Sequence, residues 1–146
     1  VIGAGKLARE RSDFIPGNFF PVTSRMRREG RSFDAVILDP PFFSQTPQGR
    51  VDVETDMIRL INKVRPLIND GGLLIAVNNA IYMEGAAYIA ALQELGADGY
   101  LKIEELIPVP PDFTGYPATR IHPPLVDPSP FNHSTKIAVL RVKKKE

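Results

Sequence analysis

A carboxylate, a rigid turn and an aromatic ring follow one another in four consecutive residues of this chain, Asp39, Pro40, Pro41 and Phe42. Both prolines have a fixed φ and no N–H group, so the carbonyl oxygens of Asp39 and Pro40 can face a cleft as hydrogen-bond acceptors. Phe43 adds a second ring. An aromatic ring beside fixed acceptors suits a flat group that carries an amine, such as a base or a side-chain amide.

Two further polar residues, Asn78 and Asn79, follow an aliphatic run at residues 73–77. The carboxyl ends of parallel strands open on the same edge of a sheet, where α/β proteins bind ligands. We therefore expect this pair at the same edge as Asp39. The two amides would either contact a polar substrate or simply turn the chain.

The elements that position these residues follow from hydrophobic patterning. Continuous aliphatic runs predict strands covered on both faces, apolar residues at helical spacing predict amphipathic helices, and alternation predicts half-exposed strands. Pro66 should kink or shorten its helix, which Asp70-Gly71-Gly72 should end. The predicted order is strand Ala35–Leu38, helix Asp52–Asn69, strand Leu73–Val77, helix Met83–Leu95, then an antiparallel pair, Tyr100–Ile107 with Lys136–Val142.

Less regular segments separate and precede these elements. We expect a short strand at Phe14–Ile15, a basic helix at Val22–Glu29, a polar loop at Ser44–Arg50 and a long proline-rich loop at 108–130. Gly3-Ala4-Gly5 begins a match to a dinucleotide fingerprint. The fingerprint needs a preceding strand and a later acidic residue, and the chain offers neither, so a loop leading into a short helix is the simpler interpretation.

The Asp-Pro-Pro-Phe sequence after a hydrophobic strand resembles motif IV of the class I S-adenosylmethionine-dependent methyltransferases. The stretches FDAVILDPPFF, NDGGLLIAVNN and FNHSTKIAVLRV resemble most the ribosomal-RNA large-subunit methyltransferase-like group, and the resemblance extends from Asp13 to Val142. It implies S-adenosyl-L-methionine as cofactor and RNA, favouring ribosomal RNA, as substrate.

The resemblance also implies roles for individual residues. It makes Asp39, Pro40, Pro41 and Phe42 the catalytic set. Asn18 matches the position that meets the adenine amine of the cofactor, Phe19 would wall the adenine, and Asp39 would help close the cofactor pocket. Phe43, Asn78 and Asn79 would contact the substrate. An amide satisfied inside a turn is an equally simple role for Asn18.

These elements predict an α/β fold, a Rossmann-like doubly wound and mostly parallel sheet with a C-terminal antiparallel hairpin, in a single catalytic domain spanning 1–146. The family has seven strands, and its N-terminal strands have no counterpart in this sequence. We expect either an upstream segment or a second copy of the chain to complete the sheet. The chain alone should bind the cofactor poorly.

Composition excludes several classes of site. The chain has no cysteine, which excludes disulfides, thiolate metal sites and thiolate nucleophiles within it, and no apolar run reaches the ~20 residues of a membrane span. We expect a cytoplasmic protein. His122 and His133 have no metal-ligand spacing, so we expect no metal site, and His133 should bond within a turn.

The net charge of +1 does not indicate a nucleic-acid partner, but the basic residues cluster. Four arginines lie between Arg25 and Arg31, and Lys143, Lys144 and Lys145 lie near the end. Each cluster is either a solvated surface or a phosphate-contacting patch.

Three functional hypotheses follow. The first is a methyltransferase acting on a base of RNA. Relatives that methylate carbon 5 of a pyrimidine often carry a cysteine where this chain has Asn78, which argues against that chemistry. The second is a methyltransferase of a protein side-chain amide or a small molecule. The third is a non-catalytic Rossmann-like binding module, against which the Asp-Pro-Pro-Phe sequence argues.

Overall fold

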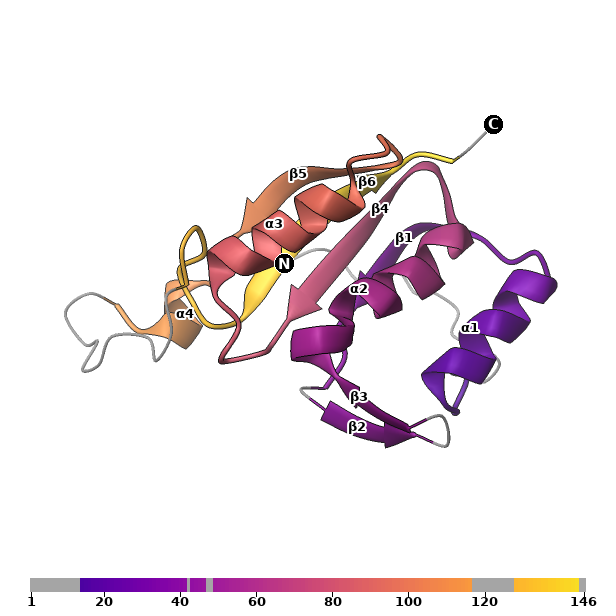
Figure 1. Ribbon diagram of the computed structural model, residues 1–146, viewed down its shortest axis with the longest axis horizontal. Coiled ribbons are helices and arrows are strands. Elements are labelled where there is room, and N and C mark those ends of the chain that lie inside the picture. Colours follow the sequence, from indigo (N-terminus) through magenta and orange to yellow (C-terminus); the bar gives the residue numbers. More distant parts are fainter. Residues whose placement is uncertain (1–13, 42, 47–48, 117–127, 145–146) are drawn as a thin grey trace, which may run out of the picture.

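A mixed four-stranded sheet organises the computed structural model, which describes residues 14–41, 43–46, 49–116 and 128–144 (Figure 1). The strand order is β1-β4-β6-β5. β1 (Phe33–Leu38) is parallel to β4 (Ile68–Asn78), and β6 (Lys136–Val142) is antiparallel to both β4 and β5 (Leu101–Ile107). The predicted parallel pair and the predicted antiparallel pair are confirmed. The prediction of a mostly parallel sheet is wrong for the described strands, because two of the three pairings within the four-stranded sheet are antiparallel.

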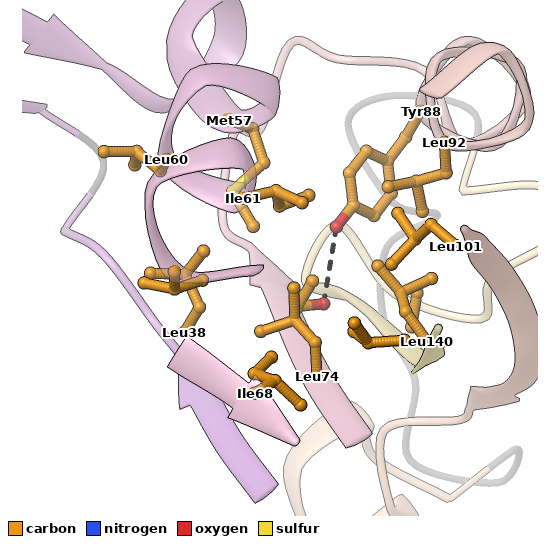
Figure 2. Packing of buried hydrophobic residues seen from close by; sticks show 14 of the residues in the cluster. Leu38, Met57, Leu60, Ile61, Ile68, Leu74, Tyr88, Leu92, Leu101 and Leu140 are labelled. Atoms are coloured by element: carbon orange, nitrogen blue, oxygen red, sulfur yellow. Dashed lines mark hydrogen bonds between the residues drawn. The ribbon is translucent and has the colours of Figure 1, made fainter. Parts of the chain in front are cut away.

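Two helices cover one face of this sheet. They are α2 (Val53–Val64) and α3 (Gly85–Leu95), which confirm the two predicted amphipathic helices. Alternate residues of β4, Leu74 and Ala76, are buried beneath them, whereas their neighbours on the opposite face remain partly exposed. Figure 2 shows the resulting core, in which side chains from α2, α3, β4, β5 and β6 meet; its members include Met57, Ile61, Leu74, Tyr88, Leu92, Leu101 and Leu140.

Pro66 shortens its helix, as predicted. α2 ends at Val64 and passes into a 3-10 turn at Arg65–Leu67, and β4 begins directly afterwards. Asp70-Gly71-Gly72 does not form the predicted helix end but lies inside β4. The pairing of β1 with β4 shifts between Phe33 and Ala35, and Gly71 has a φ of +73°. A bulge in the strand therefore accommodates the two glycines, since a positive φ suits glycine.

The structure of the N-terminal part of the chain differs from the prediction in three places. Phe14–Ile15 forms no strand. The basic helix, α1 (Phe19–Arg28), begins earlier than Val22, because Asn18 caps it. The predicted polar loop at Ser44–Arg50 contributes to an antiparallel hairpin of β2 (Phe43–Thr46) and β3 (Gly49–Asp52). Polar composition did not reveal this hairpin because strand formation depends on pairing more than on intrinsic propensity.

Two other predicted segments lie largely outside the described residues. The Gly3-Ala4-Gly5 fingerprint falls entirely there, as does His122. Of the proline-rich stretch at 108–130, the structure describes a short helix, α4 (Pro111–Thr114), and the residues next to it. No helix among the described residues is long and apolar enough to cross a bilayer.

β1 lies at one edge of the sheet, where the sequence predicts an interior strand. Its side chains are unequally covered: Leu38 is 6% exposed, facing α2, whereas Ile37 is 72% exposed on the opposite face. The prediction of a strand buried on both faces is thus wrong for the described chain. An aliphatic run indicates a strand that is covered on both faces in the folded protein. Among the described residues nothing covers the face of β1 that carries Ile37.

Candidate active site

Asp39 and Asn79 meet at the carboxyl edge of the sheet. Each residue comes directly after the end of its strand, and Leu38 of β1 is in register with Ala76 of β4. Asn79 Nδ2 donates a hydrogen bond to Asp39 Oδ1 at 2.9 Å. The prediction that they share one edge is confirmed. A carboxylate has about four acceptor sites, so Asp39 keeps acceptor capacity for a second donor.

A cleft of about 570 Å³ opens beside this pair, between α1, β1 and α2. Asp39, Pro40 and Pro41 lie at one end of its lining, and Phe19 from α1 contributes a ring. The remaining walls are mostly aliphatic and aromatic. The structure therefore brings Phe19 and the Asp-Pro-Pro turn to one cavity, although they are far apart in sequence.

Consecutive residues of β1, from Ala35 to Leu38, line the same cleft. Because successive side chains of a strand point to opposite faces, a row of consecutive residues marks the edge of the strand rather than one of its faces. The cleft therefore follows the outer edge of β1 as well as opening at its carboxyl end.

Phe19 is held in the cleft wall by its own helix. Its ring packs edge-on against Phe20, with centroids 5.2 Å apart, and Phe20 is buried in the core. The guanidinium of Arg59 lies 4.7 Å from the centre of the Phe20 ring, a cation–π contact that ties α1 to α2.

Asn18 bonds within the turn that precedes α1 and does not line the cleft. Its Oδ1 accepts a hydrogen bond from the backbone N–H of Phe20 at 3.1 Å and so caps α1. The cap fixes where α1 begins, and therefore where Phe19 points. The predicted contact between Asn18 and the adenine remains a prediction.

Asn78 is not available to a substrate, and its predicted contact with one is wrong. The side chain is fully buried; Oδ1 accepts from the backbone N–H of Ala80 at 2.8 Å, and Nδ2 lies 3.2 Å from Met83 Sδ. The inward face of β4 buries Asn78, and the alternation of the strand then places Asn79 outside. Only the second member of the predicted pair reaches the site.

Lys136 holds the turn that follows β4, and the sequence analysis did not identify it. It is 1% exposed, and its Nζ donates to the carbonyl oxygen of Ala80 at 2.8 Å and to that of Ser134. Burial lowers the pKa of the Lys136 ammonium. The signal in the sequence was a lysine directly before the aliphatic run at residues 137–140. In the structure Lys136 is in register with Asn78.

Two predicted aromatic contacts fall outside what the structure describes. Phe42 is not described, and Phe43 begins β2 with its side chain outside the description. His133 behaves as predicted, since its Nδ1 accepts from the backbone N–H of Thr135 at 3.0 Å. Across the described side chains, no group of three or more histidines, cysteines or carboxylates is placed to hold a metal ion.

Known proteins similar to this chain are methyltransferases, although no family model matches it. It is 44% identical over 45 residues to MJ1649 of Methanocaldococcus jannaschii, which bears the name of a ribosomal RNA large subunit methyltransferase; the match covers 31% of this chain and 12% of the relative. Ribosomal RNA large subunit methyltransferase I of Photobacterium profundum is 22% identical over 101 residues, 69% of this chain and 25% of the relative. The chain spans a quarter or less of these relatives.

The fold is that of a methyltransferase of known structure. The crystal structure of SMU.776, named as a methyltransferase and complexed with SAH, superposes with a TM-score of 0.68 at 22% identity, over 86% of this chain and 30% of that one. The predicted resemblance to class I and ribosomal-RNA large-subunit methyltransferases is confirmed by these similarities.

Proposed function

We propose that this chain is part of the catalytic domain of an S-adenosylmethionine-dependent methyltransferase that modifies a base of RNA, with ribosomal RNA as the favoured substrate. The hydrogen-bonded pair of Asp39 and Asn79, at the carboxyl ends of adjacent parallel strands and beside an apolar cleft, carries the proposal. The names of the relatives support the substrate, and the SAH in the SMU.776 structure, the demethylated form of the cofactor, supports the methyl donor. Such an enzyme would act in ribosomal RNA processing, in the cytoplasm.

S-adenosylmethionine supplies an electrophilic methyl group on a sulfonium, and the protein has to place a nucleophile in line with it. An exocyclic base amine is a weak nucleophile because its lone pair is delocalised into the ring. Asp39 would accept one N–H of that amine through its carboxylate, and the Pro40 carbonyl would accept another. Both contacts draw the nitrogen out of conjugation and orient its lone pair.

Asn79 and the prolines would act by positioning. The amide of Asn79 holds one carboxylate oxygen of Asp39 in place, and the fixed φ of Pro40 and Pro41 limits the directions that the turn can take. Phe42 would stack on the target base, a contact worth about 1–3 kcal/mol.

The residues of the cleft fit the adenosyl part of the cofactor. A flat ring needs apolar walls and an aromatic neighbour, and beyond the paired edge of β1 the carboxyl end of the cleft offers Leu38, Leu60 and Phe19. We propose that Phe19 and Asp39 contact the cofactor, with Asn18 placing Phe19 and meeting the adenine amine.

The outer edge of β1 would be paired in the active enzyme. It borders the cleft and carries the 72% exposed Ile37, and an unpaired strand edge is a template for another strand. We propose that further strands, from an upstream segment or a second copy of the chain, pair there and complete a doubly wound sheet.

Two aspartate–asparagine pairs on the same two strands allow a matched test. Asp34 Oδ1 accepts from Asn69 Nδ2 at 2.8 Å, an exposed bond like that of Asp39, but away from the carboxyl edge. Asp39→Ala should lower methyl transfer at least ~100-fold, as expected for a positioned polar catalytic group. Asp34→Ala removes the same kind of bond and should leave the rate within about twofold of the parent.

The measurement is single-turnover transfer of a radiolabelled methyl group to ribosomal RNA, with thermal melts of both variants. If Asp39→Ala methylates like the parent, or loses no more activity than Asp34→Ala, Asp39 only caps the turn and the catalytic assignment is wrong.

A further inference from the structure

We propose that a basic pocket binds a phosphate group in the backbone of the RNA substrate, an inference that rests on the proposed function. The pocket lies at the end of the sheet where β4 begins, opposite the end where Asp39 lies. The basic pocket is defined by four cationic side chains, Arg27, Arg65, Lys143 and Lys144.

Three segments that are distant in sequence build this pocket. Arg27 comes from the last turn of α1, Arg65 opens the 3-10 turn between α2 and β4, and Lys143 and Lys144 follow β6. Figure 1 shows that the end of β6 lies beside the turn that leads into β4; the backbone N–H of Lys144 donates to Asp70 Oδ1 there. The cavity between the segments has a volume of about 390 Å³.

The guanidinium of Arg65 is the strongest indication that the pocket binds an anion. Its Nη1 is buried and has no hydrogen-bond partner among the described residues. A buried donor without an acceptor costs free energy, and more when it is charged. Guanidinium groups bind phosphate with two parallel N–H···O bonds, so a phosphate oxygen would satisfy Nη1 and neutralise the charge at once.

Within the described part of the chain none of the four cationic side chains takes part in an ion pair, whereas Arg25, Arg59 and Arg141 are paired with Glu29, Asp56 and Glu104. Two carboxylates, Asp70 and Asp98, lie close by and accept backbone N–H groups of Lys144 and Tyr100. Four cations against two carboxylates leave the pocket with an excess of positive charge, in a protein whose net charge is only +1.

The position of the pocket suits a role in affinity rather than in the chemical step. β1 has six residues, so the two ends of the parallel strands are roughly 20 Å apart, at about 3.3 Å per residue. At ~3.4 Å per nucleotide of stacked strand, a phosphate in the pocket would lie about six nucleotides from the target base. A shorter RNA could not occupy both places.

The test is the affinity of fluorescently labelled single-stranded RNA, measured by anisotropy as a function of salt. Arg65→Gln, and separately the double variant Lys143→Gln/Lys144→Gln, should bind an RNA of about twenty nucleotides roughly tenfold more weakly, and the slope of log K against log salt should fall by about 0.7 for each phosphate that the variant no longer neutralises. A three-nucleotide RNA, which is too short to reach the Asp39 site from the pocket, should bind the parent more weakly than the RNA of about twenty nucleotides. Lys102→Gln removes an exposed charge on β5, outside the pocket, and should change the affinity less than twofold.

Thermal melts separate a folding defect from a binding defect, and the double variant, at the exposed end of β6, keeps the test valid if Arg65→Gln unfolds. Parent affinity and parent salt slope in a folded pocket variant would overturn the proposal. So would stabilisation of the parent by inorganic phosphate, absent in the variants, with no change in RNA affinity. Weakened RNA binding by the variants supports the pocket even if no protein transfers a methyl group, because binding is measured without the cofactor.

Discussion

Lys136 is a buried charge whose partners are all backbone carbonyls. Replacing it with methionine keeps the length of the side chain but leaves the oxygens of Ala80 and Ser134 without their donor. We expect Lys136→Met to lower the free energy of unfolding by about 1–3 kcal/mol, the cost of an unsatisfied buried polar group. Because Ala80 follows Asn79, the substitution should also lower methyl transfer.

Urea unfolding and the single-turnover assay measure the two effects. Ile137→Val, in the next residue of β6, trims one methylene from a half-buried side chain and serves as the control. A methionine variant that is as stable as the parent would show that the ammonium does not hold the turn.

Tyr88 predicts how stability depends on alkaline pH. Burial raises the pKa of its phenol well above the ordinary value of 10.0. The folded chain therefore keeps a proton that the unfolded chain releases once the pH passes 10.0, so the stability that this group contributes below that pH is lost as the pH rises further. Figure 2 shows the hydroxyl pointing to the carbonyl of Ala76, at 3.4 Å.

Tyr88→Phe separates the two contributions of this side chain. At neutral pH the variant should lose less than about 1 kcal/mol, because the bond to Ala76 is long. Above pH 10.0 its free energy of unfolding should fall less steeply than that of the parent, since it has no phenol to ionise. Urea titrations at both pH values measure the difference; an equal decline in parent and variant would contradict the assignment.

The site could be predicted from the sequence only where position along a strand decides exposure. Asp39 and Asn79 were predicted to share an edge because both follow aliphatic runs, and they do. Asn78 was misjudged and Lys136 was missed, because their burial depends on the packing of β6 and α3 against β4, which local pattern does not record.

Among the elements, β1 offers a sharp contrast between two adjacent residues. Leu38 is in the core and Ile37 is exposed. Leu38→Ala should lower the free energy of unfolding by about 2–5 kcal/mol, whereas Ile37→Lys should change it by less than about 0.5 kcal/mol. If further strands and helices cover this edge in the active enzyme, Ile37→Lys should nevertheless abolish cofactor binding there.

Urea unfolding of the chain and calorimetry with S-adenosylmethionine on the active enzyme measure these effects. Normal cofactor binding by Ile37→Lys would show that the edge of β1 stays open.

Element boundaries were predictable where a residue imposes backbone geometry. Pro66 ends α2 because it lacks an N–H group and clashes with the preceding turn. The Gly71–Gly72 pair was assigned to the end of a helix because the sequence does not say that β1 lies alongside it. In the structure these glycines lie in β4, at a bulge in its pairing with β1. The β2–β3 hairpin was missed for the same reason.

At the scale of the whole molecule, the sequence predicted the α/β class, the β1–β4 pairing and the β5–β6 pair, because each depends on long apolar periodicity. It did not predict the place of β6 between β4 and β5 or the exposed edge of β1. Both are properties of how strands are ordered, and order follows from the sum of all pairings rather than from any one segment.

The place of β6 also dictates the order in which the chain can fold as it is synthesised. β6 follows the other three strands of its sheet in the chain, yet it is the inner neighbour of both β4 and β5. The β1–β4 pair and its helix can form early, but β5 has no partner in the described sheet until Lys136 to Val142 have left the ribosome. Such distant pairing slows folding and leaves strand edges open meanwhile. A message cut short before the codon for Lys136 would yield a chain whose β4 edge stays open, and such a chain would be a substrate for chaperones and proteases.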